Sequence, residues 1–405
     1  MAEQHEKALV PQIRFTGFTD PWEQRKLGEL FEEHSEKDRD DLPALTIIQG
    51  GGTVHRDESN RNLQFDRNSL SNYKVVDTGD FIVHLRSFEG GLEKATCCGL
   101  VSPAYHIFRG KNVDSDFYYL YFRSKRFIDA DLKPHVYGIR DGRSIDIEGM
   151  KTIFIPWTNL AEQRRIGAFF DRLDSLITLH QRKYDKLCVL KKSMLDKMFP
   201  KGGSLYPEIR FAGFTDPWEQ RKLGELASKR IEKNTNGIKE TFTNSAEHGV
   251  VSQLDYFDHD ITNDANIGNY SVVHPDDFIY NPRISAVAPC GPINRNKLDR
   301  NGVMSPLYTV FSVDDTIDKL YLEHYFKTSR WHQFMFLEGN SGARSDRFSI
   351  SDSIFFEMPI QCPVLEEQEL IASFFGRLDS LITLHQRKLE LLRNIKKSML
   401  DKMFV

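Results

Sequence analysis

Two long segments carry apolar or large side chains at steps that alternate between four and three residues. The first, from Glu162 to Met198, contains no proline, and only Gly167 interrupts residues that favour helices. Its repeating positions are Ile166, Phe170, Leu173, Ile177, His180, Tyr184, Leu187, Lys191, Met194 and Met198. The second segment repeats them at Ile371, Phe375, Leu378, Ile382, His385, Leu389, Leu392, Lys396, Met399 and Met403. This heptad spacing predicts two helices of about 55 Å, each with a narrow stripe that needs a partner helix.

Elsewhere the pattern changes to short runs rich in β-branched and aromatic residues. Runs such as VVDTGDFIV and YHIF are bounded by Gly, Asp and Pro, which is typical of strands and turns. Phe117–Ala130 and Lys319–Phe334 carry aromatic residues at helical spacing and predict helices. The regions outside the long helices are therefore predicted to be mixed α+β domains.

The chain also repeats itself. GFTDPWEQRKLGEL occurs at Gly17–Leu30 and at Gly213–Leu226, and RLDSLITLHQRK at Arg172–Lys183 and Arg377–Lys388. KKSMLDKMF ends each copy, at Lys191–Phe199 and Lys396–Phe404. Between these blocks the copies diverge but keep matching anchors. The anchor pairs are Tyr73–Arg86 with Tyr270–Arg283, Gly99–Phe108 with Gly302–Phe311, and Gly138–Arg143 with Gly342–Arg347. Two tandem copies of one folding plan follow.

The fold predicted is α+β, with two tandem mixed α/β domains separated by two long helices. The segments are an N-terminal tail (1–12), a first domain (13–157), a first helix (158–199), a linker (200–207), a second domain (208–362) and a second helix (363–405). The eight-residue linker PKGGSLYP is too short to return along the first helix. We therefore expect the helices to form an antiparallel coiled coil with pseudo-twofold symmetry, in which His180 approaches His385.

Composition narrows the class of protein. The 405 residues carry a formal net charge of −4, and no apolar run approaches the roughly 20 residues that cross a bilayer. The N-terminus lacks the apolar core of a signal peptide, and five scattered cysteines do not form a disulfide framework. A cytoplasmic protein is expected. A chain that held DNA alone would usually be basic, so any DNA affinity must be local or shared with partners.

Motifs for catalysis are missing. No GxxxxGK(S/T) or HExxH occurs, Gly50–Gly52 lacks the spacing of a phosphate loop, and Cys97–Cys98 has no CxxC-like partner. The SP(A/L)Y and DPW runs only slightly resemble the (D/N)PPY signature of amino-methyltransferases, because each has one of the two prolines. Asp20–Glu23 is either a helix capping box or a turn into the first strand, with Trp22 and Leu27 facing the core. No catalytic residue and no metal site is predicted.

Arginines in glycine-containing loops are the candidates for DNA contact. They are Arg86, Arg140, Arg143, Arg283, Arg344 and Arg347, at matching positions of the two copies. Arginine suits bidentate contact with guanine edges and with phosphates. The alternative for each is a solvated loop charge or an ion pair within its domain. Residues shared between the copies are expected to hold the DNA backbone, and those that differ to read bases.

A second set of candidates lies on the predicted helices. Arg172, Gln181, Arg182, Lys183, Arg377, Gln386, Arg387 and Lys388 are identical in the two copies although they lie off the apolar stripe. We interpret them as a surface for a partner protein, presented twice. Recent duplication is the competing explanation, because it would preserve identity without any function.

Taken in order, these features resemble the specificity (S) subunit of type I restriction–modification enzymes over essentially the whole chain. The features are the openings at Trp22–Leu30 and Trp218–Leu226, the GDFI/DDFI and SP(A/L)Y anchors, the leads into the helices at Trp157–Gln163 and Pro363–Gln368, and the duplicated helices. In one departure, Pro363 has Thr158 as its counterpart. We expect that difference to affect only the angle at which the helix begins.

The resemblance implies two target recognition domains, each reading one half of a bipartite double-stranded DNA target, in a subunit that is not itself an enzyme. It implies two modification (methyltransferase) subunits and two restriction (ATP-dependent translocase/nuclease) subunits as partners. No cofactor is implied for this chain, with S-adenosylmethionine, Mg and ATP belonging to the partners. The alternative is a coiled-coil protein-interaction scaffold without DNA specificity. The bases read by each domain and the spacer length stay open.

Overall fold

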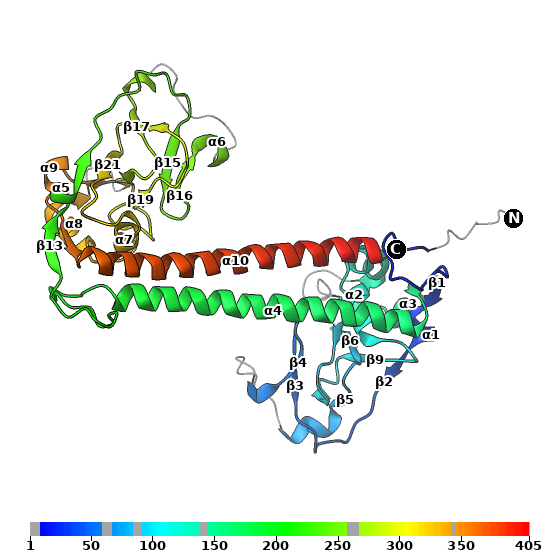
Figure 1. The fold of residues 1–405 in the computed structure, drawn as a ribbon. Coiled ribbons are helices and arrows are strands. Elements are labelled where there is room, and N and C mark those ends of the chain that lie inside the picture. The colour runs from blue at the N-terminus through cyan, green and yellow to red at the C-terminus, as the bar shows by residue number, and fades with distance from the viewer. Residues whose placement is uncertain are drawn as a thin grey trace. The chain divides into compact units, whose positions relative to one another are not determined.

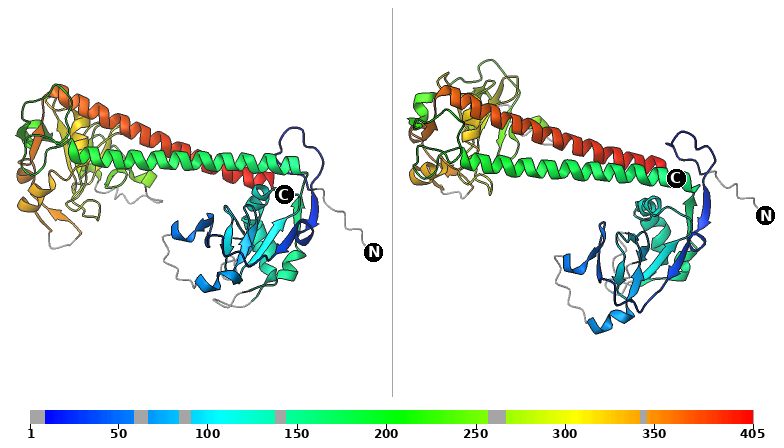
Figure 2. Two further views of the ribbon diagram at one scale, coloured as in Figure 1. Left: turned by 90° about the horizontal axis from the view of Figure 1, so that it is seen from below. Right: turned by 60° about the horizontal axis from the view of Figure 1, so that its bottom comes forward.

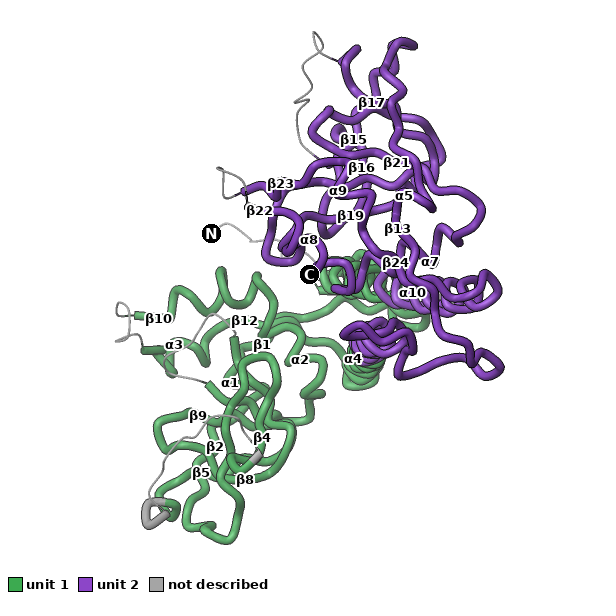
Figure 3. Tube along the Cα trace, turned by 90° about the vertical axis from the view of Figure 1, so that its left-hand side faces the viewer, with its two compact units in different colours: residues 1–181, 387–405 green, residues 182–386 purple. Residues whose placement is uncertain are grey.

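The chain divides into two compact units. The computed structural model describes residues 9–58, 67–83, 91–137, 144–256, 267–341 and 346–404. Unit 1 comprises residues 1–181 and 387–405, and unit 2 comprises residues 182–386 (Figure 3). Each unit therefore combines one variable domain with part of each long helix.

The predicted long helices are α4 (Leu160–Lys197) and α10 (Leu365–Met403), as Figure 1 shows. Every position of the predicted apolar stripe is buried or half-buried in both helices. Within each unit, parts of α4 and α10 run side by side (Figures 1 and 2). None of the helices in the described part of the chain is long and apolar enough to span a membrane.

Polar contacts join the two long helices within each unit and show their direction in unit 1. In unit 1, Lys396 Nζ lies 2.6 Å from Asp174 Oδ1, and Arg393 Nη2 donates to Gln181 Oε1 at 3.0 Å. The residue number rises on α4 as it falls on α10, so the segments are antiparallel. In unit 2, Lys191 pairs with Asp379. These are the same two positions of the repeated helix, so one contact is made once in each unit. The expected approach of His180 to His385 falls at the division between the units and stays a prediction.

The domain of unit 1 is built from short antiparallel ladders around one four-stranded sheet. That sheet has the order β2-β9-β6-β7, and the pairs β1-β12, β3-β4, β5-β8 and β10-β11 surround it. The strands are β1 (Glu23–Lys26), β2 (Phe31–His34), β3 (Leu45–Ile48), β4 (Gly52–His55), β5 (Lys74–Val76), β6 (Phe81–Val83), β7 (Glu93–Lys94), β8 (Gly99–Val101), β9 (His106–Gly110), β10 (Val136–Tyr137), β11 (Ser144–Ile145) and β12 (Phe154–Trp157). The helices are α1 (Leu27–Leu30), α2 (Ser115–Phe122) and α3 (Ile147–Lys151), with short helical turns η1 (Arg56–Glu58), η2 (Arg67–Asn72), η4 (Phe127–Leu132) and η5 (Lys133–His135).

The domain of unit 2 repeats this plan. Its four-stranded sheet has the order β14-β21-β18-β19, with the pairs β13-β24, β15-β16, β17-β20 and β22-β23. The strands are β13 (Glu219–Lys222), β14 (Ala227–Lys229), β15 (Phe242–Ser245), β16 (Gly249–Ser252), β17 (Ser271–Val273), β18 (Phe278–Tyr280), β19 (Ile293–Arg295), β20 (Gly302–Met304), β21 (Thr309–Val313), β22 (Asn340–Ser341), β23 (Phe348–Ser349) and β24 (Pro359–Cys362). The helices are α5 (Leu223–Leu226), α6 (Gln253–Tyr256), α7 (Lys319–Tyr325), α8 (His332–Glu338) and α9 (Asp352–Phe355), with the turn η7 (Ile267–Asn269). The α+β prediction is confirmed for both domains.

The repeated GFTDPWEQRKLGEL block leads into a strand. Glu23–Lys26 pairs antiparallel with Phe154–Trp157, and the second copy pairs in the same way with β24. Trp22 and Leu27 are both buried in the core. Of the two structures considered for Asp20–Glu23, the turn into a strand is right and the helix capping box is wrong. The fixed block therefore joins the first and last strands of each domain.

The two shorter predicted helices are each broken in the middle. Phe117–Ala130 is divided between α2 and η4, and Lys319–Phe334 between α7 and α8. Hydroxyl side chains lie at both breaks: Ser124 Oγ accepts from the backbone N–H of Phe127, and Thr328 Oγ1 donates to the carbonyl of Tyr325. Ser and Thr that bond to nearby backbone groups compete with the helical ladder, which explains why the aromatic periodicity alone extended these helices too far.

The ends of the long helices complete the cores of the two domains. Phe199, which follows α4, is fully buried in unit 2, with ring centroids 5.5 Å from Tyr321 and 6.1 Å from Trp218. Its repeat, Phe404, lies 5.2 Å from Phe117 in unit 1. The start of each domain is bonded to the same helix end, since the N–H of Ile13 donates to the carbonyl of Lys402, and that of Ile209 to Lys197. The KKSMLDKMF block is thus part of the core of each unit.

A buried Glu-Gln pair fixes the start of each long helix to its domain. Glu162 is fully buried and accepts two hydrogen bonds from Arg14, at 2.6 and 2.7 Å, which raise the pKa of the arginine. Gln163 accepts from the N–H of Asp114, the residue that caps α2, at 2.9 Å. In unit 2, Glu367 binds Arg210 and Gln368 binds Asp318 with the same geometry. One helical turn thus holds three separate segments of the domain.

The difference between Thr158 and Pro363 does more than alter the start of a helix. The Thr158 hydroxyl donates to Glu162, which also accepts from the Trp22 indole at 3.2 Å. Proline has no hydroxyl, and the Trp218 indole N–H is buried without a hydrogen-bond partner. The expectation that this position affects only the helix angle is therefore wrong. It also determines how completely the buried glutamate is bonded.

Candidate nucleic-acid interface

Two of the predicted DNA-contacting arginines lie together in unit 2. Arg283 follows β18 and is exposed, and Arg347 comes just before β23. The two residues are direct partners in an antiparallel bridge. On either side of them, the N–H of Ile284 donates to the carbonyl of Asp346 at 2.9 Å and the N–H of Phe348 to Pro282 at 2.7 Å. Arg86, Arg140, Arg143 and Arg344 lie outside the described residues.

This pairing places two guanidinium groups on one face. Residues directly opposite in an antiparallel pair point to the same side, and like charges at such positions destabilise the pair. Bound phosphate would remove that repulsion, and arginine forms bidentate bonds with phosphate or guanine. The arrangement of these two arginines is therefore more favourable with an anionic ligand bound than in the free domain.

A cavity of about 290 Å³ adjoins this arginine pair. Arg347 lines it together with Tyr280 from β18 and Leu307 from the SPLY anchor, and Leu307 is exposed. The sequence reasoning missed Tyr280 and Leu307 as candidates. Only the position of Leu307 inside a repeated anchor could have pointed to it. An aromatic and an aliphatic side chain beside an arginine provide the apolar and charged contacts that base edges need.

The SP(A/L)Y anchors form turns. The N–H of Tyr308 donates to the carbonyl of Ser305 at 3.0 Å, and the N–H of Tyr105 to Ser102 at 3.1 Å. Each turn leads directly into a strand of the four-stranded sheet, β21 or β9. The anchors thus have a structural role in both copies, which accounts for their repetition without catalysis.

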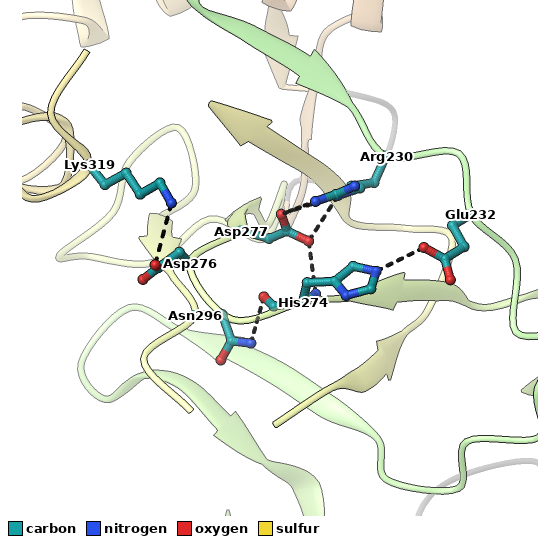
Figure 4. Close-up of polar contacts among 7 residues, drawn as sticks. All are labelled: Arg230, Glu232, His274, Asp276, Asp277, Asn296 and Lys319. Carbon is teal, nitrogen blue, oxygen red and sulfur yellow. Dashed lines mark hydrogen bonds and ion pairs between the residues drawn. The ribbon is translucent and has the colours of Figure 1, made fainter. Parts of the chain in front are cut away.

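The GDFI and DDFI anchors are also structural. Figure 4 shows Arg230 and the backbone N–H of His274 directed at Asp277, at 3.2 and 2.8 Å. Burial raises the pKa of Asp277, and the bonds from His274 and Arg230 oppose that effect. In unit 1 the same carboxylate, Asp80, is bound by Arg109 at 2.8 Å. Each domain thus has the same buried turn, held by an arginine from a different part of the sheet: Arg109 in β9 and Arg230 directly after β14.

The neighbouring residue of this turn shows how the copies diverge. Gly79 has a φ of +94°, a conformation that favours glycine, whereas Asp276 adopts a φ of +68° at the same position. Asp276 is held there by Arg295 at 2.7 Å and by Lys319 at 3.5 Å, and Figure 4 shows the contact with Lys319. Ion pairs offset the backbone strain of a non-glycine residue, so the turn survives the change in sequence.

The predicted partner surface is accessible on both helices. Of these residues, Gln181 is half-buried by its bond from Arg393, and the other seven are exposed: Arg172, Arg182, Lys183, Arg377, Gln386, Arg387 and Lys388.

The structure adds exposed leucines to this surface. On α4, Leu176 and Leu179 follow Arg172 by four and seven residues, and their exposed fractions are 37% and 46%. On α10, Leu381 and Leu384 have the same spacing from Arg377 and are exposed as well. Side chains at this spacing share one helix face. The sequence reasoning missed these leucines, although their repetition in the identical blocks was a visible signal.

A comparison with models of known protein families finds a match in the second copy of the repeat. The model of the type I restriction modification DNA specificity domain matches residues 215–394, which begin just before β13 and end within α10. A putative type I restriction enzyme MjaX specificity subunit from Methanocaldococcus jannaschii is 23% identical over 309 residues, which cover 72% of this chain and 68% of that protein.

One solved structure shares the fold of this chain. The S subunit of a type I restriction-modification system from M. genitalium aligns with a TM-score of 0.58 and 14% identity, covering 98% of this chain and 99% of that one. The HsdS subunit from Thermoanaerobacter tengcongensis aligns over 95% and 96% of the two chains, with a TM-score of 0.46 and 16% identity. The matched domain, the curated relative and the duplicated architecture agree. Residues 215–394 thus match the type I restriction modification DNA specificity domain, and the chain shares its fold with the S subunit from M. genitalium.

Proposed function

We propose that each domain reads one half of a bipartite double-stranded DNA target and directs adenine methylation by modification subunits and cleavage by restriction subunits. The subunit itself is not an enzyme. The main support for this proposal is that the same contacts, at the long helices and at the ends of each domain, form twice, whereas the loops between them differ. We call these repeated contacts the frame. The pairs Asp174–Lys396 and Asp379–Lys191 and the pairs Arg14–Glu162 and Arg210–Glu367 belong to the frame.

Within this proposal, Arg283 and Arg347 hold the DNA backbone beside the cavity, and the exposed Leu307, which differs from Ala104 at the matching position of unit 1, contacts bases. Arg86, Arg140, Arg143 and Arg344 have the corresponding role in the loops that match them in sequence. Contacts to phosphate position a protein, and contacts to base edges specify the sequence.

Exchange of one domain tests the function. Replacing residues 227–358 by the corresponding segment of another specificity subunit keeps β13, β24 and the Glu-Gln pair. We expect adenine methylation, mapped by long-read sequencing in cells that contain the partner subunits, to change in one half of the target motif and keep its spacing. The frame, which stays constant, would set that spacing.

The reciprocal exchange of residues 31–153 is the matched control, because it should change the other half alone. A methylome that neither exchange alters, with active partners present, would contradict DNA reading and leave the alternative of a protein-interaction scaffold.

We further propose two modification and two restriction subunits as partners, with S-adenosylmethionine, Mg and ATP bound by those partners. The complex would act in the cytoplasm. The net charge of −4 supports a shared DNA interface, since partner subunits would supply part of the phosphate neutralisation.

The repeated face of the helices is proposed to bind the modification subunits. Replacing Leu381 and Leu384 by aspartate should weaken binding of a modification subunit at least tenfold, because each change puts a charge into a desolvated apolar contact. Affinity measured by surface plasmon resonance or calorimetry checks the change. The thermal midpoint should shift little, since both leucines are exposed.

Leu391 provides the control for this prediction. It is 59% exposed on α10 but lies outside the repeated block. Leu391→Asp should leave partner affinity unchanged. If it weakened binding as much as the double variant, the repeated face would not be the docking surface.

A further inference from the structure

A cavity in unit 2 differs in its chemistry from the cavity at the matching position of the described part of unit 1. It has a volume of about 350 Å³ and lies among the β15–β16 turn, β19, α7 and the adjoining parts of α4 and α10. His324 lines it from α7, and Lys327 lines it from the turn that follows. A second cavity of about 520 Å³ adjoins it, because Lys191, Lys327, Asp379 and Ile382 line both.

His324 is the first sign of a ligand. The residue is 1% exposed, and neither ring nitrogen has a hydrogen-bond partner. Its ring packs against Phe375, with centroids 5.1 Å apart. Burial lowers the pKa of His324 to about 4, and the nearby charge of Lys191 acts in the same direction. The ring is therefore neutral at pH 7, with one N–H left to donate. A buried polar group without a partner is costly, and a bound acceptor would remove that cost.

Lys327 is the second sign. Its ammonium donates to the side-chain oxygen of Asn294, a neutral group, although the residue itself reaches solvent. Within the described ranges, no carboxylate lies within 4.0 Å of Lys327 Nζ. Desolvation by the surrounding protein lowers its pKa. The other cations of the same cavity are already paired, Lys191 with Asp379, and Arg295 and Lys297 with Glu323.

The matching region of unit 1 has other side chains in place of His324 and Lys327. Counted from the residues that cap α2 and α7, Leu120 occupies the place of His324, and Arg123 that of Lys327. Arg123 pairs with buried Glu93, which stands where unit 2 has Asn294. The unit 1 cavity, of about 220 Å³, is lined by Asp116, Asp171 and Asp174, with Lys94 as its cation. Unit 2 thus has an amide in place of the Glu93 carboxylate and an imidazole in place of Leu120, while Glu247, Glu323 and Asp379 also line its cavity.

We propose that the unit 2 cavity binds a phosphate-type oxyanion between His324 and Lys327. A tetrahedral oxyanion accepts hydrogen bonds from several directions, which suits one imidazole N–H and one ammonium group three residues apart, near the end of α7 and in the turn that follows it. Lys192 lines the adjoining cavity and adds positive charge there, whereas Arg330 of the same cavity is paired with Asp196. The ligand is the phosphate group of either the DNA backbone or a free phosphate compound. The site does not depend on the proposed reading of DNA.

Inorganic phosphate tests the site in the full chain. Titrated at constant ionic strength against chloride, it should raise the thermal midpoint of the parent protein in a saturable way. His324→Leu, which introduces the unit 1 residue, and Lys327→Gln should each weaken the phosphate affinity at least tenfold. Lys239→Gln, the same charge change at an exposed lysine away from the cavity, should leave it unaltered. Equal phosphate effects in all four proteins, or no effect in the parent, would overturn the proposal.

DNA binding distinguishes the two sources of phosphate. If a backbone phosphate occupies the site, Lys327→Gln should reduce the slope of log affinity against log salt by about one, and free phosphate should compete with duplex DNA. If DNA affinity and its salt slope stay unchanged while the phosphate-dependent midpoint shift is lost, the ligand is a free phosphate compound. Neither measurement uses methylation, so failure of this site and failure of the proposed function can be told apart.

Discussion

Replacing Phe199 by alanine is expected to lower the free energy of unfolding of unit 2 by about 3–5 kcal/mol, the usual cost of removing a buried aromatic ring. Phe199 is fully buried, and its ring contacts Trp218, Tyr321, Tyr325 and Phe375. Hydrogen exchange of the full chain, followed by mass spectrometry, would measure the loss separately in the two units.

The repeat supplies the matched comparison. Phe404→Ala should destabilise unit 1 instead, and by less, because Phe404 is only half-buried. Val189→Ala, on the helix that precedes Phe199 and 70% exposed, should change stability by no more than about 0.5 kcal/mol. If Phe199→Ala accelerated exchange equally in both units, the ends of the helices would not belong to separate cores.

The second large effect is expected at Glu162. Glu162→Gln should lower the free energy of unfolding of unit 1 by about 3–5 kcal/mol, because it leaves the Arg14 charge unpaired in a largely buried position. Four donors converge on this carboxylate: two from Arg14 and one each from Trp22 and Thr158. A neutral amide offers one oxygen to these donors and turns an N–H₂ group toward the rest. Chemical denaturation with tryptophan fluorescence would follow the change directly.

Unit 2 tests the same reasoning with fewer bonds. Glu367 accepts two bonds from Arg210, and the indole of Trp218 and the ring of Pro363 add none. Glu367→Gln should therefore cost less than Glu162→Gln. Glu366→Gln, at the exposed neighbouring position, should be close to neutral. A larger loss at Glu367 than at Glu162 would contradict the role given to the Thr158 hydroxyl.

Most of the secondary structure could be predicted from local sequence patterns. The heptad stripes of α4 and α10 could be read from the chain because helical periodicity depends only on residues a few positions apart. The shorter helices were extended too far, since the hydroxyls of Ser124 and Thr328 bond to the backbone there. Among the candidate site residues, matching positions in the two copies pointed to Arg283 and Arg347. Leu176 and Leu381 were missed because an exposed leucine looks like a core residue in a sequence.

By itself, the sequence determined two copies of one plan, a pair of long amphipathic helices and the frame blocks that repeat between them. Only the tertiary structure decided what those blocks do. Glu162 meets Arg14 across 148 residues, and Phe404 enters a core whose other members lie near the start of the chain. The cavity of unit 2 likewise depends on Asn294, His324 and Lys327 from separate segments. Contacts between distant segments depend on how whole elements pack, and no periodicity along the chain encodes that packing.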